Sequence, residues 1–241
     1  MSKKGIRSNF VVIFLVFNLT LLPVLAQVED SDSVVVERIR LIQKMLDRDK
    51  RGANGWWYGW LAGYSAATIV QGVVAVSTNE RATRQDMLLG AGTTLLGAAG
   101  QLITPNTPGR AADQLERITE ETGDARLHKL QRAEELLKES ALSEKRGRSW
   151  KLHAITGVVN LTSGLITWLG FDRDVWAGLG NFALNTVITE SQIWTTPTRA
   201  MKDYKEYCRR YKTANDPVLL KQNITWFVNP YPGGIKIKIV F

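Results

Sequence analysis

Few residues in this 241-residue chain have the types and spacing that chemistry requires. The chain has two histidines, His128 and His153, and one cysteine, Cys208. A protein zinc site takes three or four ligands, so these three residues do not predict one. Asp172 and Asp174 could form a carboxylate pair, but aspartates around one arginine are also typical of a tight turn. We therefore assign no catalytic, cofactor-binding or metal-binding residue and do not expect an enzyme.

Cys208 is the one candidate for a reactive side chain. It precedes Arg209 and Arg210, and neighbouring cations favour the thiolate form of a cysteine. A partly buried helix cysteine is the alternative interpretation. A single cysteine also excludes a disulfide within the chain.

The net charge of +8 is unevenly distributed. Residues 190–241 hold 9 basic and 4 acidic side chains, whereas the segments before them nearly balance. A basic end of this kind could contact anionic lipid or an envelope protein, and nothing indicates a nucleic-acid partner. The candidate contacts are Lys202, Lys205, Arg209, Arg210 and Lys212.

The first 26 residues have the pattern of a secretory signal peptide. Lys3, Lys4 and Arg7 precede an uncharged run over residues 8–28, and Ala26 supplies a small residue at the expected cleavage site. We therefore predict export to the cell envelope. An uncleaved signal anchor is the alternative, and Gln27 in place of cysteine gives no sign of a lipoprotein.

An amphipathic helix is predicted next, in the segment 27–51. Apolar residues recur there at three- and four-residue spacing, and Gly52 is expected to end the helix. Four uncharged stretches follow, and short polar links join the first to the second, at residues 80–86, and the third to the fourth, at residues 172–174. These predict two helical hairpins, at 52–109 and 152–198.

Both hairpins are rich in glycine, which costs up to about 1 kcal/mol in a helix interior relative to alanine. Because small residues allow two helix backbones to approach closely, we expect these glycines to lie at contacts between helices. The candidate helix-packing residues are Gly63, Gly72, Gly90, Gly97, Gly157, Gly164 and Gly178.

The remaining segments differ from the hairpins in composition. Residues 110–151 are highly charged with narrow apolar stripes, which predicts a helical connector with a seam for a partner surface. A break is predicted at Thr122–Asp124, with Asp124 as the N-cap of the next helix. Residues 199–241 predict a short basic helix and then a β-hairpin, because isoleucines alternate with lysines near the end. The fold class is therefore mainly α, with a short C-terminal β-hairpin.

The two hairpins resemble each other in sequence. Thr107–Ala111 after the first matches Thr196–Ala200 after the second, and Leu89–Gly92 matches Ala177–Gly180. The distance from the glycine pair to the proline motif agrees within one residue. We interpret this as a two-fold internal repeat.

Two functions remain open from the sequence. The first three apolar stretches are long enough to span a membrane, although the fourth is short, and tryptophans near the starts of the hairpins could form an interfacial belt. Against this, few basic residues lie in the loops expected inside, and the stretches contain Asn and Gln. We predict a non-enzymatic, membrane-associated helical protein of the envelope with a structural or interaction role. The alternative is a soluble periplasmic or secreted module that binds an apolar ligand or peptide.

Overall fold

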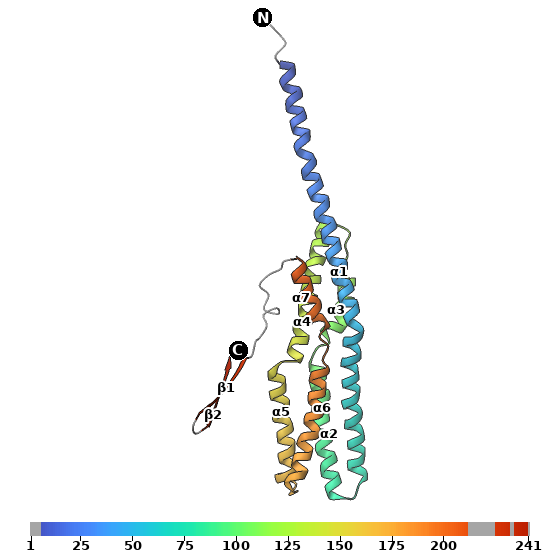
Figure 1. Ribbon diagram of the computed structural model, residues 1–241. Coiled ribbons are helices and arrows are strands. Elements are labelled where there is room, and N and C mark those ends of the chain that lie inside the picture. The colour runs from blue at the N-terminus through green and yellow to red at the C-terminus, as the bar shows by residue number, and fades with distance from the viewer. Residues whose placement is uncertain (1–5, 212–224, 232–233, 241) are drawn as a thin grey trace.

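The protein forms two helical bundles stacked end to end (Figure 1). The computed structural model describes the backbone of residues 6–211, 225–231 and 234–240, and the side chains of residues 32–211. The prediction of a mainly α-helical fold is confirmed. We call the bundle of residues 32–52 of α1 (Ile6–Ser77) with α3 (Thr107–Glu116), α4 (Gly123–Gly147) and α7 (Arg199–Tyr211) the charged bundle. The Gly-rich bundle consists of residues 53–77 of α1 with α2 (Arg81–Ile103), α5 (Trp150–Leu165) and α6 (Val175–Thr195).

Helix α1 (Ile6–Ser77) runs through both bundles without a break (Figure 1). The predicted helix end at Gly52 is therefore wrong. Glycine permits a helix end but does not require one, and its cost of about 1 kcal/mol is small beside tertiary packing. Ala53 and Trp57 are both buried just after it, so packing holds the chain helical across this point.

The charged bundle contains the main apolar core. It is built by α1 with α3 (Thr107–Glu116), α4 (Gly123–Gly147) and α7 (Arg199–Tyr211). The seam predicted for a partner surface is thus covered by helices of the same chain. The core consists of Ile39, Ile42, Met45, Leu46, Ala111, Ala112, Leu115, Leu130, Ala133, Leu136, Leu137, Ala141, Tyr204, Tyr207 and Cys208.

The Gly-rich bundle contains the two predicted helical hairpins. The second half of α1 pairs with α2 (Arg81–Ile103), and α5 (Trp150–Leu165) pairs with α6 (Val175–Thr195). A π-helical turn, η1 (Ile166–Gly170), extends α5. Helices α2 and α6 have 23 and 21 residues, which corresponds to about 30 Å at 1.5 Å per residue.

Turn chemistry explains the aspartates between α5 and α6. Asp172 adopts a left-handed conformation with φ of 54°, which Asp tolerates better than most residues. The Asp174 carboxylate accepts a hydrogen bond from the Ala177 backbone N–H at 3.0 Å and caps α6. Arg173 lies 3.4 Å from Asp86 of α2, so an ion pair joins the two hairpins at this end.

The break in the charged connector lies where the sequence predicts it, but the capping residue differs. The Thr122 side chain, not Asp124, accepts a hydrogen bond from the Ala125 backbone N–H at 3.2 Å. Asp124 instead lies in the first turn of α4, where a negative charge interacts well with the helix dipole.

The C-terminal segment holds two paired backbone strands. β1 (Thr225–Tyr231) and β2 (Gly234–Val240) run antiparallel, with Thr225 opposite Val240. Their side chains lie outside the described part, and residues 32–211 contain no strand. The C-terminal hairpin therefore stays a prediction, as does any contact by Lys212.

The arrangement of the helices supports the internal repeat. Each half has a charged helix, an apolar hairpin, a Thr-Pro motif and a short helix that returns to the charged bundle. The resemblance extends to Asp49-Lys50-Arg51-Gly52 in α1 and Glu144-Lys145-Arg146-Gly147 in α4. The halves differ at this point, because α1 continues whereas α4 ends and α5 begins.

Candidate functional site between the two hairpins

The outward faces of the Gly-rich bundle are strongly apolar. Three helical stretches, Asp32–Ser77, Arg81–Glu116 and Gly123–Gly170, each contain a window apolar enough to cross a membrane. Only 11% of that window is buried in each of the first two. Large aliphatic side chains at least half exposed include Ile69, Val70, Val76, Leu88, Leu95, Leu96, Leu102, Ile103, Ile155, Val158, Leu161, Leu169, Leu184 and Val187.

The interior of each hairpin is polar by contrast. In the second hairpin the buried Asn160 donates a hydrogen bond to Thr189 at 2.9 Å, and the Ser163 hydroxyl donates one to Asn181 at 2.7 Å. In the first, the Thr68 hydroxyl donates one to Thr94 at 2.8 Å. Burying such groups is costly unless they are paired, and here they pair with one another.

A chain of hydrogen bonds joins the two hairpins. The Tyr64 hydroxyl donates to the Gln192 side-chain oxygen at 2.9 Å, and the Gln192 amide nitrogen donates to Gln101 at 3.0 Å. The Gln101 amide nitrogen in turn donates to the Trp57 carbonyl oxygen at 3.1 Å. The chain connects α1, α6 and α2, so it fixes how the hairpins are placed against each other.

A cavity of about 290 Å³ lies beside this chain of hydrogen bonds, between the two hairpins. Its walls combine aliphatic side chains such as Leu96 and Val159 with the uncharged amides of Asn160, Asn185 and Gln192. No charged residue is among those that line it in the described part of the chain. The cavity therefore offers both apolar surface and uncharged hydrogen-bonding groups.

Four of the seven candidate glycines lie at close helix contacts. A Cβ on Gly164 would lie 2.8 Å from the Gly178 carbonyl oxygen, and a Cβ on Gly178 would lie 2.8 Å from that of Gly164. A Cβ on Gly97 would lie 2.7 Å from the Tyr64 ring, and one on Gly90 equally close to the Gln71 amide. Both hairpins thus depend on glycine for their close approach.

The other three candidate glycines do not lie at contacts. Nothing is within 4 Å of a Cβ built on Gly63, Gly72 or Gly157. Their spacing resembles that of the contact glycines, so the sequence pattern alone does not distinguish the two groups.

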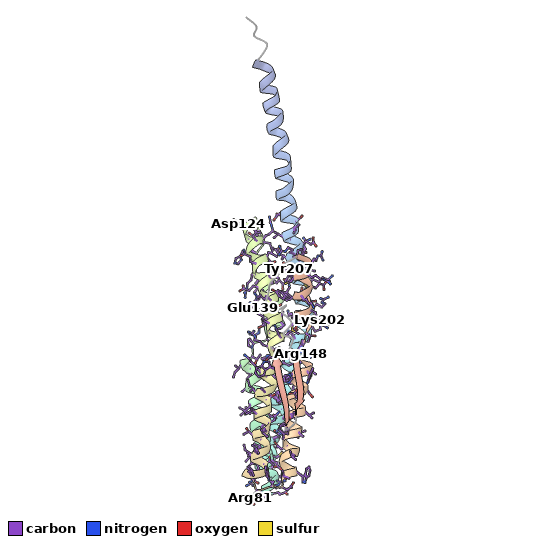
Figure 2. All side chains as sticks on the ribbon, turned by 60° about the vertical axis from the view of Figure 1, so that its left-hand side comes forward. Arg81, Asp124, Glu139, Arg148, Lys202 and Tyr207 are labelled. Atoms are coloured by element: carbon purple, nitrogen blue, oxygen red, sulfur yellow. The ribbon has the colours of Figure 1, made fainter. Side chains whose placement is uncertain are left out.

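Tryptophans lie at both ends of the Gly-rich bundle. Trp150 and Trp194 are exposed near the charged bundle, and Trp168 and Trp176 are exposed at the opposite end. Amphipathic rings at these two levels are typical of helices that span a bilayer. Arg148, labelled between the bundles in Figure 2, donates hydrogen bonds to the carbonyl oxygens of Trp194 and Thr196 at the end of α6.

His153 pairs with a carboxylate that the sequence analysis missed. Its Nδ1 lies 2.9 Å from both carboxylate oxygens of Glu190, and its ring lies 5.9 Å from that of Trp194. No nucleophile belongs to this arrangement, so it joins α5 to α6 without indicating catalysis. A lone acidic residue directly after an apolar stretch was the available signal for Glu190.

Three buried carboxylates lie where the two bundles meet. Glu144 accepts a hydrogen bond from the Met201 backbone N–H at 2.9 Å, and Asp203 pairs with Arg48 at 2.5 Å. Asp49 is 4% exposed and neither of its oxygens has a hydrogen-bond partner, with the Arg199 Nε 3.9 Å away. Burial, with Asp203 and Glu144 nearby, raises the pKa of Asp49 to about 7.

The pKa of Glu144 is also raised, as is that of Asp49. Burial raises the pKa of Glu144, and the backbone N–H groups at the start of α7 oppose that rise. The sequence signal for both acids was their shared position before Lys-Arg-Gly in the two halves.

The remaining sequence candidates lie on α7. Lys202, Lys205, Arg209 and Arg210 are exposed, and Arg210 pairs with Glu37 of α1 at 2.7 Å. Cys208 is buried in the core of the charged bundle and forms no disulfide. Its burial places the thiol out of reach of large oxidants and favours the structural interpretation.

No protein-family model, no curated protein and no solved structure matches this chain. Among the described residues, no group of three or more His, Cys, Asp or Glu side chains is arranged to hold a metal ion.

Proposed function

We propose that the protein is an exported integral membrane protein of the cell envelope with a non-enzymatic, structural or interaction role. The Gly-rich bundle spans the bilayer, and the charged bundle lies in water at one membrane surface. The observation that carries the proposal is the inverted polarity of the Gly-rich bundle. Its aliphatic side chains point outward, while its hydrogen-bonded amides and hydroxyls lie inside.

Energetics support this placement. A large exposed apolar surface is unfavourable in water but favourable in hydrocarbon. Backbone polar groups within the four spanning segments are satisfied by helical hydrogen bonds, as the bilayer core requires. The lengths of α2 and α6 match a hydrocarbon core of about 30 Å.

Export of the N-terminus would place the charged bundle outside the cytoplasm. The short loops at the opposite end, between α1 and α2 and between η1 and α6, would then lie inside. The exposed basic face of α7 is on the charged bundle, where it could contact anionic headgroups or an envelope protein.

Fractionation tests membrane integration directly. The protein is expected to stay with membranes after washes at high salt and at alkaline pH, because its attachment is apolar. Release into the soluble fraction by either wash would overturn the proposal. It would favour the soluble module for an apolar ligand, which the cavity between the hairpins could also serve.

A matched pair of substitutions sharpens this test. Leu184 is 63% exposed at the middle of α6, and Leu127 is 51% exposed on α4 in the charged bundle. Arginine at the centre of a spanning helix costs about 2.5–3.5 kcal/mol of insertion free energy, whereas an exposed site in water changes stability by about 0.5 kcal/mol or less. Leu184→Arg should therefore reduce membrane insertion while Leu127→Arg leaves it unchanged. Equal, small effects of both would contradict a bilayer around α6.

A further inference from the structure

The cavity between the hairpins is placed where a membrane component can reach it. It is lined from both hairpins, by residues of α1, α2, α5 and α6. The surfaces beside it are the exposed aliphatic faces described above, so its surroundings are hydrocarbon once the proposed function is accepted. A ligand drawn from the bilayer therefore rests on the proposed function, which places this bundle in lipid.

The residues that line the cavity favour a ligand that is uncharged but carries a polar group. Charged ligands would lose their hydration with no opposite charge to replace it, because no ionic side chain lines the cavity among the described residues. A pure hydrocarbon would make no hydrogen bond with the amide groups on the cavity walls. An uncharged polar group on a hydrocarbon chain matches both kinds of surface.

Two amides define where the polar group would lie. The Asn160 amide nitrogen donates to Thr186 and Thr189, and the Asn185 amide nitrogen donates to Ser163 and Asn181. Neither amide oxygen accepts a hydrogen bond in the described part of the chain. Both oxygens are therefore suited to accept one from a ligand hydroxyl.

The size of the cavity limits the ligand. A volume of about 290 Å³ is at the lower end of the roughly 300–1,000 Å³ found for small-molecule pockets. It is suited to one short chain rather than a whole two-chain phospholipid.

We propose that this cavity binds a neutral amphiphile from the bilayer, with its hydrocarbon chain along Val159 and Ile188 and its hydroxyl group near Asn160 and Asn185. The ligand is held between the two halves of the internal repeat. Its binding would stabilise the contact between the hairpins that the chain of hydrogen bonds through Gln192 already makes.

Photolabelling of the full chain in phosphatidylcholine vesicles tests the proposal. The probe is a decanol derivative with a diazirine on its chain, and labelled residues are identified by mass spectrometry. Labelling of Val159 and Ile188, which line the cavity, should saturate with probe concentration and be suppressed by excess 1-decanol. Excess decane or decanoate should suppress it much less, because one lacks the hydroxyl and the other is charged.

Two variants and one control connect the labelling to the cavity. Thr156→Phe fills the cavity from α5 and should abolish the saturable labelling. Asn160→Leu removes an amide oxygen and should remove the preference for decanol over decane. Val158→Phe lies on the outward face of the same helix, at 65% exposure, and should change neither.

The same experiment separates failure of this inference from failure of the proposed function. Outward residues such as Ile69 and Val76 are labelled without saturation if the bundle lies in lipid. Their labelling together with non-saturable labelling of Val159 and Ile188 would overturn the binding site while leaving the membrane proposal intact. Competition by decane equal to that by decanol would overturn the proposed ligand class. Absence of outward labelling would overturn the membrane proposal itself.

Discussion

Asp49 provides a quantitative prediction, because its carboxyl group is buried without a hydrogen-bond partner at the junction of the two bundles. Its pKa rises from 3.8 to about 7 in the folded protein. Between these values the unfolded chain loses the proton while the folded chain keeps it. Stability is therefore highest below about pH 4 and falls as the pH rises towards 7.

The magnitude follows from the shift. Three pKa units correspond to about 4 kcal/mol, of which about 2–3 kcal/mol is lost between pH 5 and pH 8. In a chain of this size, 1 kcal/mol changes the melting temperature by about 2–4 °C. The Asp49 carboxyl should therefore lower the melting temperature by about 5–10 °C between these two pH values.

Asp49→Asn removes the titrating group and keeps the shape of the side chain. The assay is thermal unfolding of the full chain in detergent micelles at pH 5 and pH 8. The wild type should lose about 5–10 °C more than the variant over this interval. Asp47→Asn is the control, because Asp47 is exposed on the same helix and should give the same pH dependence as the wild type.

One result would refute this reasoning. If the wild type and Asp49→Asn differ by the same amount at pH 5 and at pH 8, the carboxyl does not titrate in this range. The Arg199 guanidinium, 3.9 Å away, would then hold Asp49 ionised throughout.

Two further predictions concern the glycine contacts and the basic face. Gly178→Leu should destabilise the second hairpin by several kcal/mol, because its Cβ would lie 2.8 Å from the Gly164 carbonyl oxygen. Gly157→Leu is the control and should have little effect, because nothing lies within 4 Å of a Cβ at that position. Thermal unfolding compares the two variants, and equal losses of stability would contradict the packing argument. Replacing the exposed α7 cations Lys202, Lys205 and Arg209 by glutamate should reduce binding of the protein to anionic vesicles at low salt, measured by flotation. The same substitutions with unchanged binding would exclude this face as the lipid contact. Deleting the chain after Thr198 would be a poorer test of lipid contact, because it would also remove Tyr204 and Tyr207 of α7 from the core of the charged bundle.

The order of the helices could be predicted from local pattern. Apolar periodicity and short polar links are properties of adjacent residues, so they identify both hairpins and the break near Thr122 without tertiary information. The end of the first helix could not be predicted in this way. At Gly52 the outcome depends on the burial of Ala53 and Trp57, which is a long-range effect.

Which side of each apolar helix faces inward was decided by the tertiary structure. The sequence contains Asn160, Asn185 and Gln192 among apolar residues, and this composition fits both a soluble bundle and a membrane bundle. Their hydrogen bonds lie inside the bundle with aliphatic residues outside, which is the arrangement that supports the proposed membrane bundle. The same distinction applies to the glycines, because contact depends on the helix face and not on spacing.

The sequence by itself determined the helical composition, the two apolar hairpins, the repeated Thr-Pro motifs and the basic character of the last quarter of the chain. These follow from residue type and short-range spacing. Only the tertiary structure decided that the charged connector packs on its own chain, that Asp49 lies buried beside Glu144 and Asp203, and that a neutral cavity separates the hairpins. Each of these depends on contacts between helices far apart in the sequence, which no local pattern relates.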